Sequence, residues 1–322
     1  MTVVALLLLA GFIILIKGAD FLVSGASSIA SRMGISNLAI GLTVVAFGTS
    51  MPEMVVNLIS GITGKNDAAF GNIIGSNNFN LLMILGLSGV IFPLVVQRKT
   101  VQYEIPMSLV FTLLLFVLVN DNLVWGSSEN VLTRPEGAIL LTGFAAFLMY
   151  IYRTMKQASD YEEEGRLVLF STGKSVGLIF IGLIMLIGGG KLAVDNAVKI
   201  AAYFGLSEKL IGLTILAAGT SLPELATSAV AAYRKNTDIA IGNVVGSNIF
   251  NVTLILGLNG LIKPIPYNTL INFDLYVLTG TTLLMLVFMY TLNPRKLDRI
   301  EALLLLMAYI IYMVYLFRLE QK

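Results

Sequence analysis

Apolar stretches of about 20 residues follow one another along most of the chain, and short polar segments separate them. A helix of about 20 apolar residues crosses the hydrocarbon core of a bilayer. The first stretch has no basic segment before it and continues past Lys17 and Asp20, so we expect a retained span rather than a removable signal. The pattern predicts an all-α membrane protein with ten transmembrane helices, at residues 2–30, 37–61, 68–92, 102–120, 135–155, 173–202, 207–232, 239–262, 270–291 and 300–318.

The composition makes the bilayer the expected solvent of the protein. Hydrophobic residues are 57% of the 322 residues, charged residues are 12%, and the mean hydropathy is +0.86. A net charge of +2 gives no electrostatic case for a nucleic-acid partner. The absence of Cys and His from the sequence excludes thiol and imidazole chemistry and His or Cys metal sites. The remaining oxygen groups suit hard cations, so we expect neither a cofactor nor enzyme activity.

Two segments of the first half recur in the second half. Residues 41–53, GLTVVAFGTSMPE, match 212–224, GLTILAAGTSLPE, at 9 of 13 positions. Residues 71–80, GNIIGSNNFN, match 242–251, GNVVGSNIFN, at 7 of 10 positions, and both pairs have the same offset of 171 residues. Each half holds five predicted helices, so the second half must enter the membrane from the opposite side. Inverted repeats of this kind build a midplane binding site in many secondary transporters.

The repeat divides the chain into a five-helix repeat at 1–155, a linker at 156–172 and a second five-helix repeat at 173–322. The linker contains three consecutive glutamates, at 162–164, which is typical of a solvated connection. Lys and Arg are more numerous in the loops on the side of the linker, and cytoplasmic loops carry such an excess. We therefore predict a multi-pass protein of the cytoplasmic membrane with a cytoplasmic linker and both termini extracellular.

Glu53 and Glu224 occupy corresponding positions in the two repeats and lie deep within apolar stretches. An ionised side chain at the bilayer centre costs at least about 2.5–3.5 kcal/mol. One interpretation is structural, in which Lys17 or Lys191 forms a buried ion pair with a glutamate. The other is functional, in which a transported cation neutralises the two carboxylates. We favour the second, because ion pairs explain neither the neighbouring hydroxyl groups nor the prolines beside the glutamates.

Both glutamates have the same polar neighbours. Hydroxyl groups on the same helical face precede each one: Thr49 and Ser50 in the first half, and Thr220 and Ser221 in the second. A proline immediately precedes each glutamate, and its ring clashes with the carbonyl group one turn earlier. Carbonyl groups freed at membrane depth must be satisfied by protein or face a cavity. A bound cation would satisfy them.

The following helix of each repeat adds a second polar stripe. Its members are spaced four residues apart: Asn72, Ser76 and Asn80, and then Asn243, Ser247 and Asn251. For the first asparagine of each stripe, hydrogen bonding between helices and ion contact stay equally plausible. For the other four residues we favour ion contact. The glycines at 71, 75, 242 and 246 are expected to let neighbouring helices approach closely.

Together these groups form an oxygen cluster with a formal charge of −2. Such a cluster suits Ca2+, which takes about 6–8 oxygen ligands, and it would also suit two or three Na+ ions. A doubly charged site without ions would be costly to expose and bury again. We therefore expect the protein to change its accessible side only when ions are bound, which is the physical basis of obligatory exchange.

At these residues the sequence resembles the cation/Ca2+ antiporter superfamily, particularly its sodium/calcium exchangers. The paired GTSxPE and GNxxGSNxxN segments are similar to the two alpha-repeats of that family. The resemblance implies ten helices, alternating access, and ion sites between helices 2, 3, 7 and 8. It also implies that Glu53 and Glu224 are the central ligands, with the carbonyl groups of Ala46 and Ala217 as outer Na+ contacts. The supporting ligands it implies are Thr49, Thr220, Ser50, Ser221, Ser76 and Ser247.

Some positions distinguish branches of that superfamily. Potassium-dependent relatives carry Asp where this chain has Asn251, so the chain is similar to the potassium-independent type. Proton-coupled relatives carry an acidic residue where Gly75 and Gly246 stand. Asp20 aligns with Lys191 in the repeat, so the first and sixth helices are not electrically equivalent.

The leading hypothesis is Na+/Ca2+ exchange, with Ca2+, Na+ and the lipid bilayer as partners. The nearest alternative is exchange of Ca2+ or another divalent cation for H+ on the same scaffold. An intramembrane hydrolase, a scaffold and an ion channel are disfavoured. The sequence TGKS at 172–175 resembles part of a phosphate loop, but Val168 stands where the first glycine is needed, so no nucleotide is expected.

Overall fold

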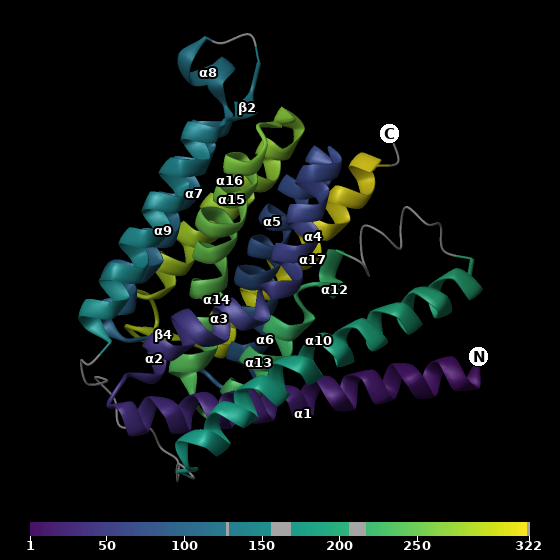
Figure 1. Ribbon diagram of the computed structural model, residues 1–322, viewed down its shortest axis with the longest axis vertical. Helices are drawn as coiled ribbons and strands as arrows, with labels where there is room; N and C mark the ends of the chain where they lie inside the picture. Colours follow the sequence, from purple (N-terminus) through teal and green to yellow (C-terminus); the bar gives the residue numbers. More distant parts are fainter. Residues whose placement is uncertain (127–128, 156–168, 206–216, 321–322) are drawn as a thin grey trace.

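The computed structural model describes residues 1–126, 129–155, 169–205 and 217–320. Within these ranges the chain is almost entirely helical, and the helices form one bundle with two long outer helices lying obliquely across it (Figure 1). In the first half the elements are α1 (Thr2–Met33), α2 (Asn37–Ile40), η1 (Gly41–Val45), α3 (Ala46–Thr49), α4 (Met51–Thr63), α5 (Asn66–Phe79), η2 (Asn80–Ile84), α6 (Leu85–Ile91), β1 (Leu94–Val95), η3 (Thr100–Glu104), α7 (Ile105–Val119), α8 (Asp121–Trp125), β2 (Val131–Leu132) and α9 (Arg134–Thr154).

In the second half the elements are α10 (Thr172–Tyr203), α12 (Ala217–Gly219), α13 (Leu222–Tyr233), α14 (Thr237–Ile249), η5 (Phe250–Ile255), α15 (Leu256–Ile262), β3 (Ile265–Pro266), η6 (Thr269–Ile271), α16 (Asn272–Phe288), β4 (Lys296–Leu297) and α17 (Arg299–Glu320). The prediction of a helical membrane protein is confirmed. Among the described residues, eight helices are long and apolar enough to cross a membrane, and the bent pair 37–63 would be a ninth. The predicted span 207–232 lies partly outside the described residues, so the number ten stays a prediction.

The helices divide into a buried centre and a periphery that exposes apolar surface. The most apolar stretch of the span Thr237–Ile262 is 94% buried and that of Asn66–Ile91 is 78% buried, whereas the values for Arg134–Thr154 and Arg299–Arg318 are 22%. The outer helices expose large apolar side chains such as Ile184 and Ile311. Exposed apolar side chains on the outer faces of these helices suit contact with lipid.

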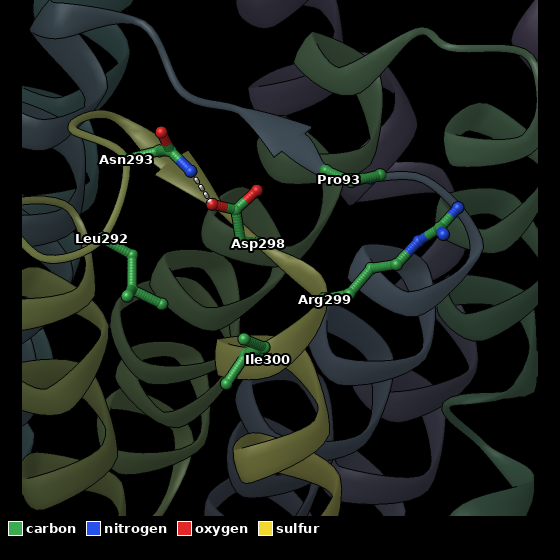
Figure 2. Close-up of a pocket in the computed structure, with 6 residues that line it drawn as sticks. All are labelled: Pro93, Leu292, Asn293, Asp298, Arg299 and Ile300. Carbon is green, nitrogen blue, oxygen red and sulfur yellow. Dashed lines mark hydrogen bonds between the residues drawn. The ribbon is translucent and has the colours of Figure 1, made fainter.

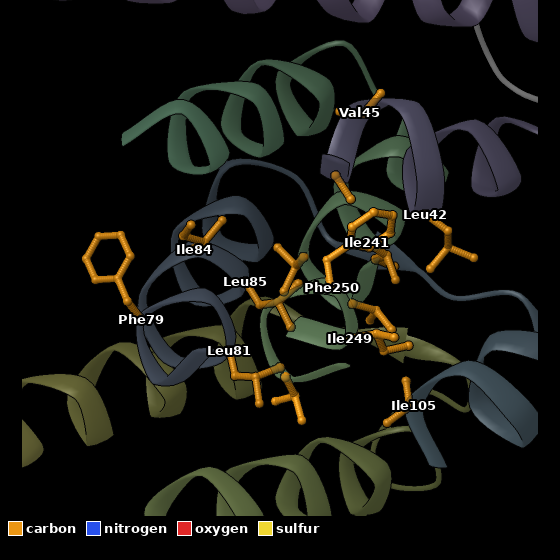
Figure 3. Close-up of a cluster of buried hydrophobic side chains, with 14 of the residues drawn as sticks. Leu42, Val45, Phe79, Leu81, Ile84, Leu85, Ile105, Ile241, Ile249 and Phe250 are labelled. Carbon is orange, nitrogen blue, oxygen red and sulfur yellow. The ribbon is translucent and has the colours of Figure 1, made fainter. Parts of the chain in front are cut away.

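Both halves contribute to one apolar core. Leu42, Phe79 and Ile84 of the first half gather with Ile249 and Phe250 of the second half (Figure 3). Two short antiparallel ladders also join the halves, because β1 pairs with β4 and β2 pairs with β3. The core thus holds the two repeats against each other and brings their polar segments to the centre.

The outer helices α1 and α10 pack closely along their length, side by side (Figure 1). A Cβ atom on Gly18 would lie 2.9 Å from the Gly182 carbonyl oxygen, and one on Gly182 would lie 2.7 Å from the Leu22 backbone nitrogen. Gly189 makes the same approach to Leu15. Glycines spaced seven residues apart therefore let the two backbones touch.

Breaks in the helices occur at the polar motifs. The helical pair Asn37–Thr49 and Met51–Thr63 bends by 49°. Ser50 lies at the break with φ −81° and ψ 5°, and Ser221 has nearly the same angles, φ −89° and ψ 7°. In each half a proline lies two residues after this serine, in the first turn of the new helix. Proline has no backbone N–H, and an N–H in the first turn has no acceptor within the helix, so no hydrogen bond is lost. The π-helical segments η2 and η5 begin at or just before the last asparagine of each stripe.

The expected close approach at the motif glycines holds in one half. A Cβ on Gly242 would lie 2.9 Å from the Leu38 carbonyl oxygen, and one on Gly246 would lie 2.8 Å from the Ala46 Cβ. At Gly71 and Gly75, no atom of the described residues lies within 4 Å of such a Cβ. The residues at 209 and 213, which correspond to Leu38 and Leu42, lie outside the described residues, so the expectation stays a prediction for Gly71 and Gly75.

Candidate cation-binding site

Glu53 and Glu224 lie in the first turns of α4 and α13, directly after the helix breaks, and each is 1% exposed. The N-terminus of a helix carries partial positive charge, which stabilises a carboxylate placed there. Neither glutamate forms an ion pair within the described residues. Lys17 and Lys191, considered above as counter-charges, are exposed, so the structure argues against the ion-pair interpretation.

Two serines connect the halves through the glutamates. The Ser50 hydroxyl donates to Glu224 Oε1 over 2.9 Å, and the Ser221 hydroxyl donates to Glu53 Oε1 over 2.8 Å. A second hydroxyl lies 3.0 Å from each of these serine oxygens, that of Ser247 beside Ser50 and that of Ser76 beside Ser221. The structure therefore brings both glutamates and four of the predicted hydroxyl groups into one buried cluster.

Four buried oxygen atoms of the predicted site residues have no hydrogen-bond donor among the described residues. They are Glu53 Oε2, Glu224 Oε2, Asn80 Oδ1 and Asn251 Oδ1. All four residues are 1% exposed. A buried acceptor without a partner costs roughly 1–3 kcal/mol, and more when it is charged. Two charged and two neutral oxygens, arranged as corresponding pairs, form a donor set that hard cations prefer.

The two predicted threonines bind side-chain amides of the facing half. Thr49 Oγ1 donates to Asn243 Oδ1 over 3.0 Å, and Thr220 Oγ1 donates to Asn72 Oδ1 over 3.4 Å. Asn243 Nδ2 in turn donates to the Ser228 hydroxyl over 2.9 Å. For the first asparagine of each stripe, the structure thus gives the hydrogen bonding between helices that was one of the two interpretations.

The two predicted carbonyl positions differ in what the structure describes. The Ala46 carbonyl oxygen accepts from the Ser50 backbone N–H over 3.0 Å and from Thr49 Oγ1 over 3.3 Å. Ala217 is the first residue of α12. The part of the second motif at 212–216 lies outside the described residues, so only the helical end of that segment is placed.

Asn77 and Asn248 also take part in the polar contacts between the halves, although the sequence pattern did not indicate them. Asn77 Oδ1 accepts from Asn251 Nδ2, and Asn248 Oδ1 accepts from Asn80 Nδ2, both over 2.9 Å. Both residues are part of the repeated GSN segment, which was a usable signal. The four-residue spacing of the stripes excluded them, because they lie one position off the polar face.

Other polar groups in the helices lie apart from the glutamates. Two carboxylates near the ends of spans accept hydrogen bonds from tyrosines: Glu104 from Tyr150 and Asp274 from Tyr312, each over 2.6 Å.

A surface pocket of about 340 Å3 lies at the loop before α17 and is lined by Pro93, Leu292, Asn293, Asp298, Arg299 and Ile300 (Figure 2). Its carboxylate already accepts from the Asn293 amide, and none of the predicted site residues lines it.

The fold and the cluster define a multi-pass integral membrane protein with a buried oxygen site shared by two sequence repeats. The family model described as "Sodium/calcium exchanger protein" matches residues 3–153 and 174–318. The chain belongs to the sodium/calcium exchanger family of the cation/Ca2+ antiporter superfamily, which consists of transporters rather than enzymes.

Individual relatives match over nearly their whole length. The sodium/calcium exchanger MaX1 of Methanosarcina acetivorans is 28% identical, over 98% of this chain and 99% of its own. The membrane protein MJ0091 of Methanocaldococcus jannaschii is 35% identical over 94% of both chains. A structure of the sodium-calcium exchanger NCX_Mj, soaked without Na+ and Ca2+, is 34% identical with a TM-score of 0.81, and the match covers 98% of this chain and all of the other.

Proposed function

We propose that this protein is a secondary antiporter that exchanges Na+ for Ca2+ across the cytoplasmic membrane by alternating access. The observation that carries the proposal is a set of four buried oxygens, of Glu53, Glu224, Asn80 and Asn251, to which no group of the described residues donates a hydrogen bond. Na+ rather than H+ is supported by the similarity to MaX1 and NCX_Mj, which are both named sodium/calcium exchangers. It is also supported by glycine, instead of an acid, at Gly75 and Gly246.

We assign the ligand roles as follows. The two glutamates supply the charge of −2 that one Ca2+ neutralises, and each has one oxygen for the ion that accepts no hydrogen bond from the described part of the chain. The ligand set also includes the oxygens of Thr49, Thr220, Ser50, Ser221, Ser76, Ser247, Asn80, Asn251, Ala46 and Ala217. With Na+ bound instead, two or three ions share the same oxygens. The site with no ion leaves two buried carboxylates without a counter-charge, which disfavours conformational change in that state.

The two repeats, 1–155 and 173–322, have opposite orientations in the membrane, and the linker at 156–172 is cytoplasmic. Corresponding contacts support this arrangement, because Ser50 contacts Glu224 as Ser221 contacts Glu53. The chain has no Cys, so single cysteines report accessibility without interference. Membrane-impermeant maleimide applied to intact cells should label Lys65→Cys and spare Arg98→Cys, two exposed positions between predicted spans. The reverse labelling would overturn the proposed orientation.

Transport is tested by 45Ca2+ uptake into proteoliposomes. Vesicles loaded with Na+ should accumulate Ca2+ when diluted into Na+-free buffer, and uptake should not follow an imposed pH gradient. Glu53→Gln should reduce uptake at least about 100-fold, whereas the exposed Asp195→Asn should retain it. Uptake that ignores Na+ and follows the pH gradient would instead assign Ca2+/H+ exchange. Equal uptake by Glu53→Gln and the unmodified protein would remove that residue from the mechanism.

A further inference from the structure

Asn77 and Asn248 contribute no unpartnered oxygen to the candidate site, yet each binds one of the asparagines that does. We propose that they are positioning residues, which turn the side-chain oxygens of Asn251 and Asn80 toward the bound ion. The inference rests on the proposed function and deepens it, because it assigns how the site orients two neutral ligands.

The orientation starts from the backbone. Asn77 Nδ2 donates to the Asn248 carbonyl oxygen over 3.2 Å, and Asn248 Nδ2 donates to the Asn77 carbonyl oxygen over 3.4 Å. A carbonyl oxygen can only accept, so the nitrogen end of each side-chain amide must face it. The oxygen end of each amide is thereby fixed on the opposite side.

The fixed oxygens then set the next pair of amides. Asn77 Oδ1 can bind only the nitrogen end of Asn251, and Asn248 Oδ1 can bind only the nitrogen end of Asn80. The oxygens of Asn251 and Asn80 must therefore point away, and both are buried without a donor among the described residues. The same sequence of hydrogen bonds occurs twice, once from Asn77 to Asn251 and once from Asn248 to Asn80. This repetition makes coincidence a poor explanation.

The network also affects the charge of the site. A carboxylate at position 251 would place an oxygen against Asn77 Oδ1, where the Asn251 amide now donates over 2.9 Å. Two acceptors at that distance repel each other, and a rotation of Asn77 would lose its bond to the Asn248 carbonyl group. The arrangement therefore favours a neutral donor at position 251 and keeps the formal charge of the cluster at −2.

Single substitutions give the first test, measured as equilibrium 45Ca2+ binding to purified protein. Asn77→Ala and Asn248→Ala should each weaken Ca2+ affinity about tenfold, since removing a group that orients a metal ligand typically costs 10–100-fold. Asn78→Ile is the matched control. Asn78 is a buried asparagine next to Asn77, it binds the Asp274 carbonyl oxygen, and the second repeat has Ile249 at this position. Its Ca2+ affinity should stay within twofold of the unmodified protein.

Double substitutions separate positioning from general destabilisation. In the Asn251→Ala background, adding Asn77→Ala should cause less than a twofold further loss, because the oriented ligand is already absent. In the Asn80→Ala background it should still cause about a tenfold loss. Asn248→Ala should show the opposite dependence, so the mirrored pair provides a second cycle if one variant fails to fold.

Equal losses in both backgrounds would overturn the positioning role while leaving Ca2+ binding by the unmodified protein, and hence the proposed function, intact. Failure of the unmodified, folded protein to bind 45Ca2+ would overturn both proposals together. A loss caused by Asn78→Ile as large as that caused by Asn77→Ala would also contradict the inference, because the effect would then follow from any change in this part of α5.

Discussion

Around the two glutamates, several polar contacts of one half have a counterpart in the other. Ser50 binds Glu224 as Ser221 binds Glu53, and Asn80 binds Asn248 as Asn251 binds Asn77. At the outer helices this correspondence ends. Asp20 of α1 forms an ion pair with Arg234, whereas Lys191, at the corresponding position of α10, is exposed and forms no ion pair within the described residues.

The difference separates two requirements. Under the proposed mechanism, the same ligands must bind ions that arrive from either face, and equivalent groups from two inverted repeats meet that need. The outer helices have to pack against each other and against the bundle, and packing does not require equal charges. Arg234 also donates to Ser24, and Asn236 donates to Ser27 over 2.9 Å, so α1 has polar attachments to the loop between α13 and α14.

The largest expected effect tests the equivalence at the centre. Glu224→Gln should reduce Na+-driven Ca2+ uptake as strongly as Glu53→Gln, at least about 100-fold, because each variant halves the charge that neutralises Ca2+. Glu104→Gln is the control, since Glu104 is also a buried carboxylate and glutamine can still accept from Tyr150. It should keep uptake within about threefold. A tenfold difference between the two glutamate variants would contradict the equivalence.

The next largest effect concerns packing of the outer helices. Gly182→Leu places a Cβ 2.7 Å from the Leu22 backbone nitrogen, where no flexible side chain can give way. Overpacking of this kind typically costs 1–3 kcal/mol, so the thermal unfolding midpoint in detergent should fall by about 3–8 °C. Gly177→Leu, on the same helix with no described atom within 4 Å of its Cβ, should not lower the midpoint. Equal midpoints for the two variants would show that α1 and α10 tolerate separation.

Much of this arrangement could be predicted from the sequence. Hydropathy is a property of neighbouring residues, and an internal repeat is found by comparing the chain with itself. The predicted spans that lie within the described ranges end within about three residues of the observed helices. The repeated GTSxPE and GNxxGSNxxN segments identified residues that the structure brings together. In each case the signal came from spacing along the chain.

Other features depend on contacts that spacing does not encode. Asn77 and Asn248 face each other across two helices, and the π-helical segments at Asn80 and Asn251 shift the helical period on which the stripe argument relied. The Arg234 partner of Asp20 lies in the other half of the chain. The contacts between helices are fixed by helix-to-helix register rather than by periodicity.

A smaller effect is expected at the asymmetric ion pair. Asp20 and Arg234 are each about a third exposed, so water screens their attraction, and Asp20→Asn should cost only about 0.5 kcal/mol. The unfolding midpoint should fall by about 1–2 °C, and Lys191→Gln should leave it unchanged. Exchanging the two charges, as Asp20→Arg with Arg234→Asp, should restore part of the loss. A midpoint that Asp20→Asn does not change would mean that the hydrogen bonds to Ser24 and Ser27 suffice to hold α1.

The smallest effect is expected at the starts of α9 and α17. Both helices begin with the same kind of backbone hydrogen bond to a glutamate, but the capping residue is Thr133 in the first half and Asp298 in the second. The Thr133 N–H donates to Glu136 and the Asp298 N–H donates to Glu301, over 2.7 and 3.0 Å. Only the second cap residue titrates, and the hydrogen bond from Asn293 lowers its pKa below the usual value for Asp.

Because the folded-state pKa of Asp298 is lowered, its stabilising contribution is present above the unfolded value near 4 and is lost as the pH falls through the folded value. Asn293→Ala should therefore lower the unfolding midpoint slightly at pH 7, by about 1 °C, and by less at pH 3. An Asn293→Ala effect that persists unchanged at pH 3 would show that the amide acts through loop packing rather than through the Asp298 charge.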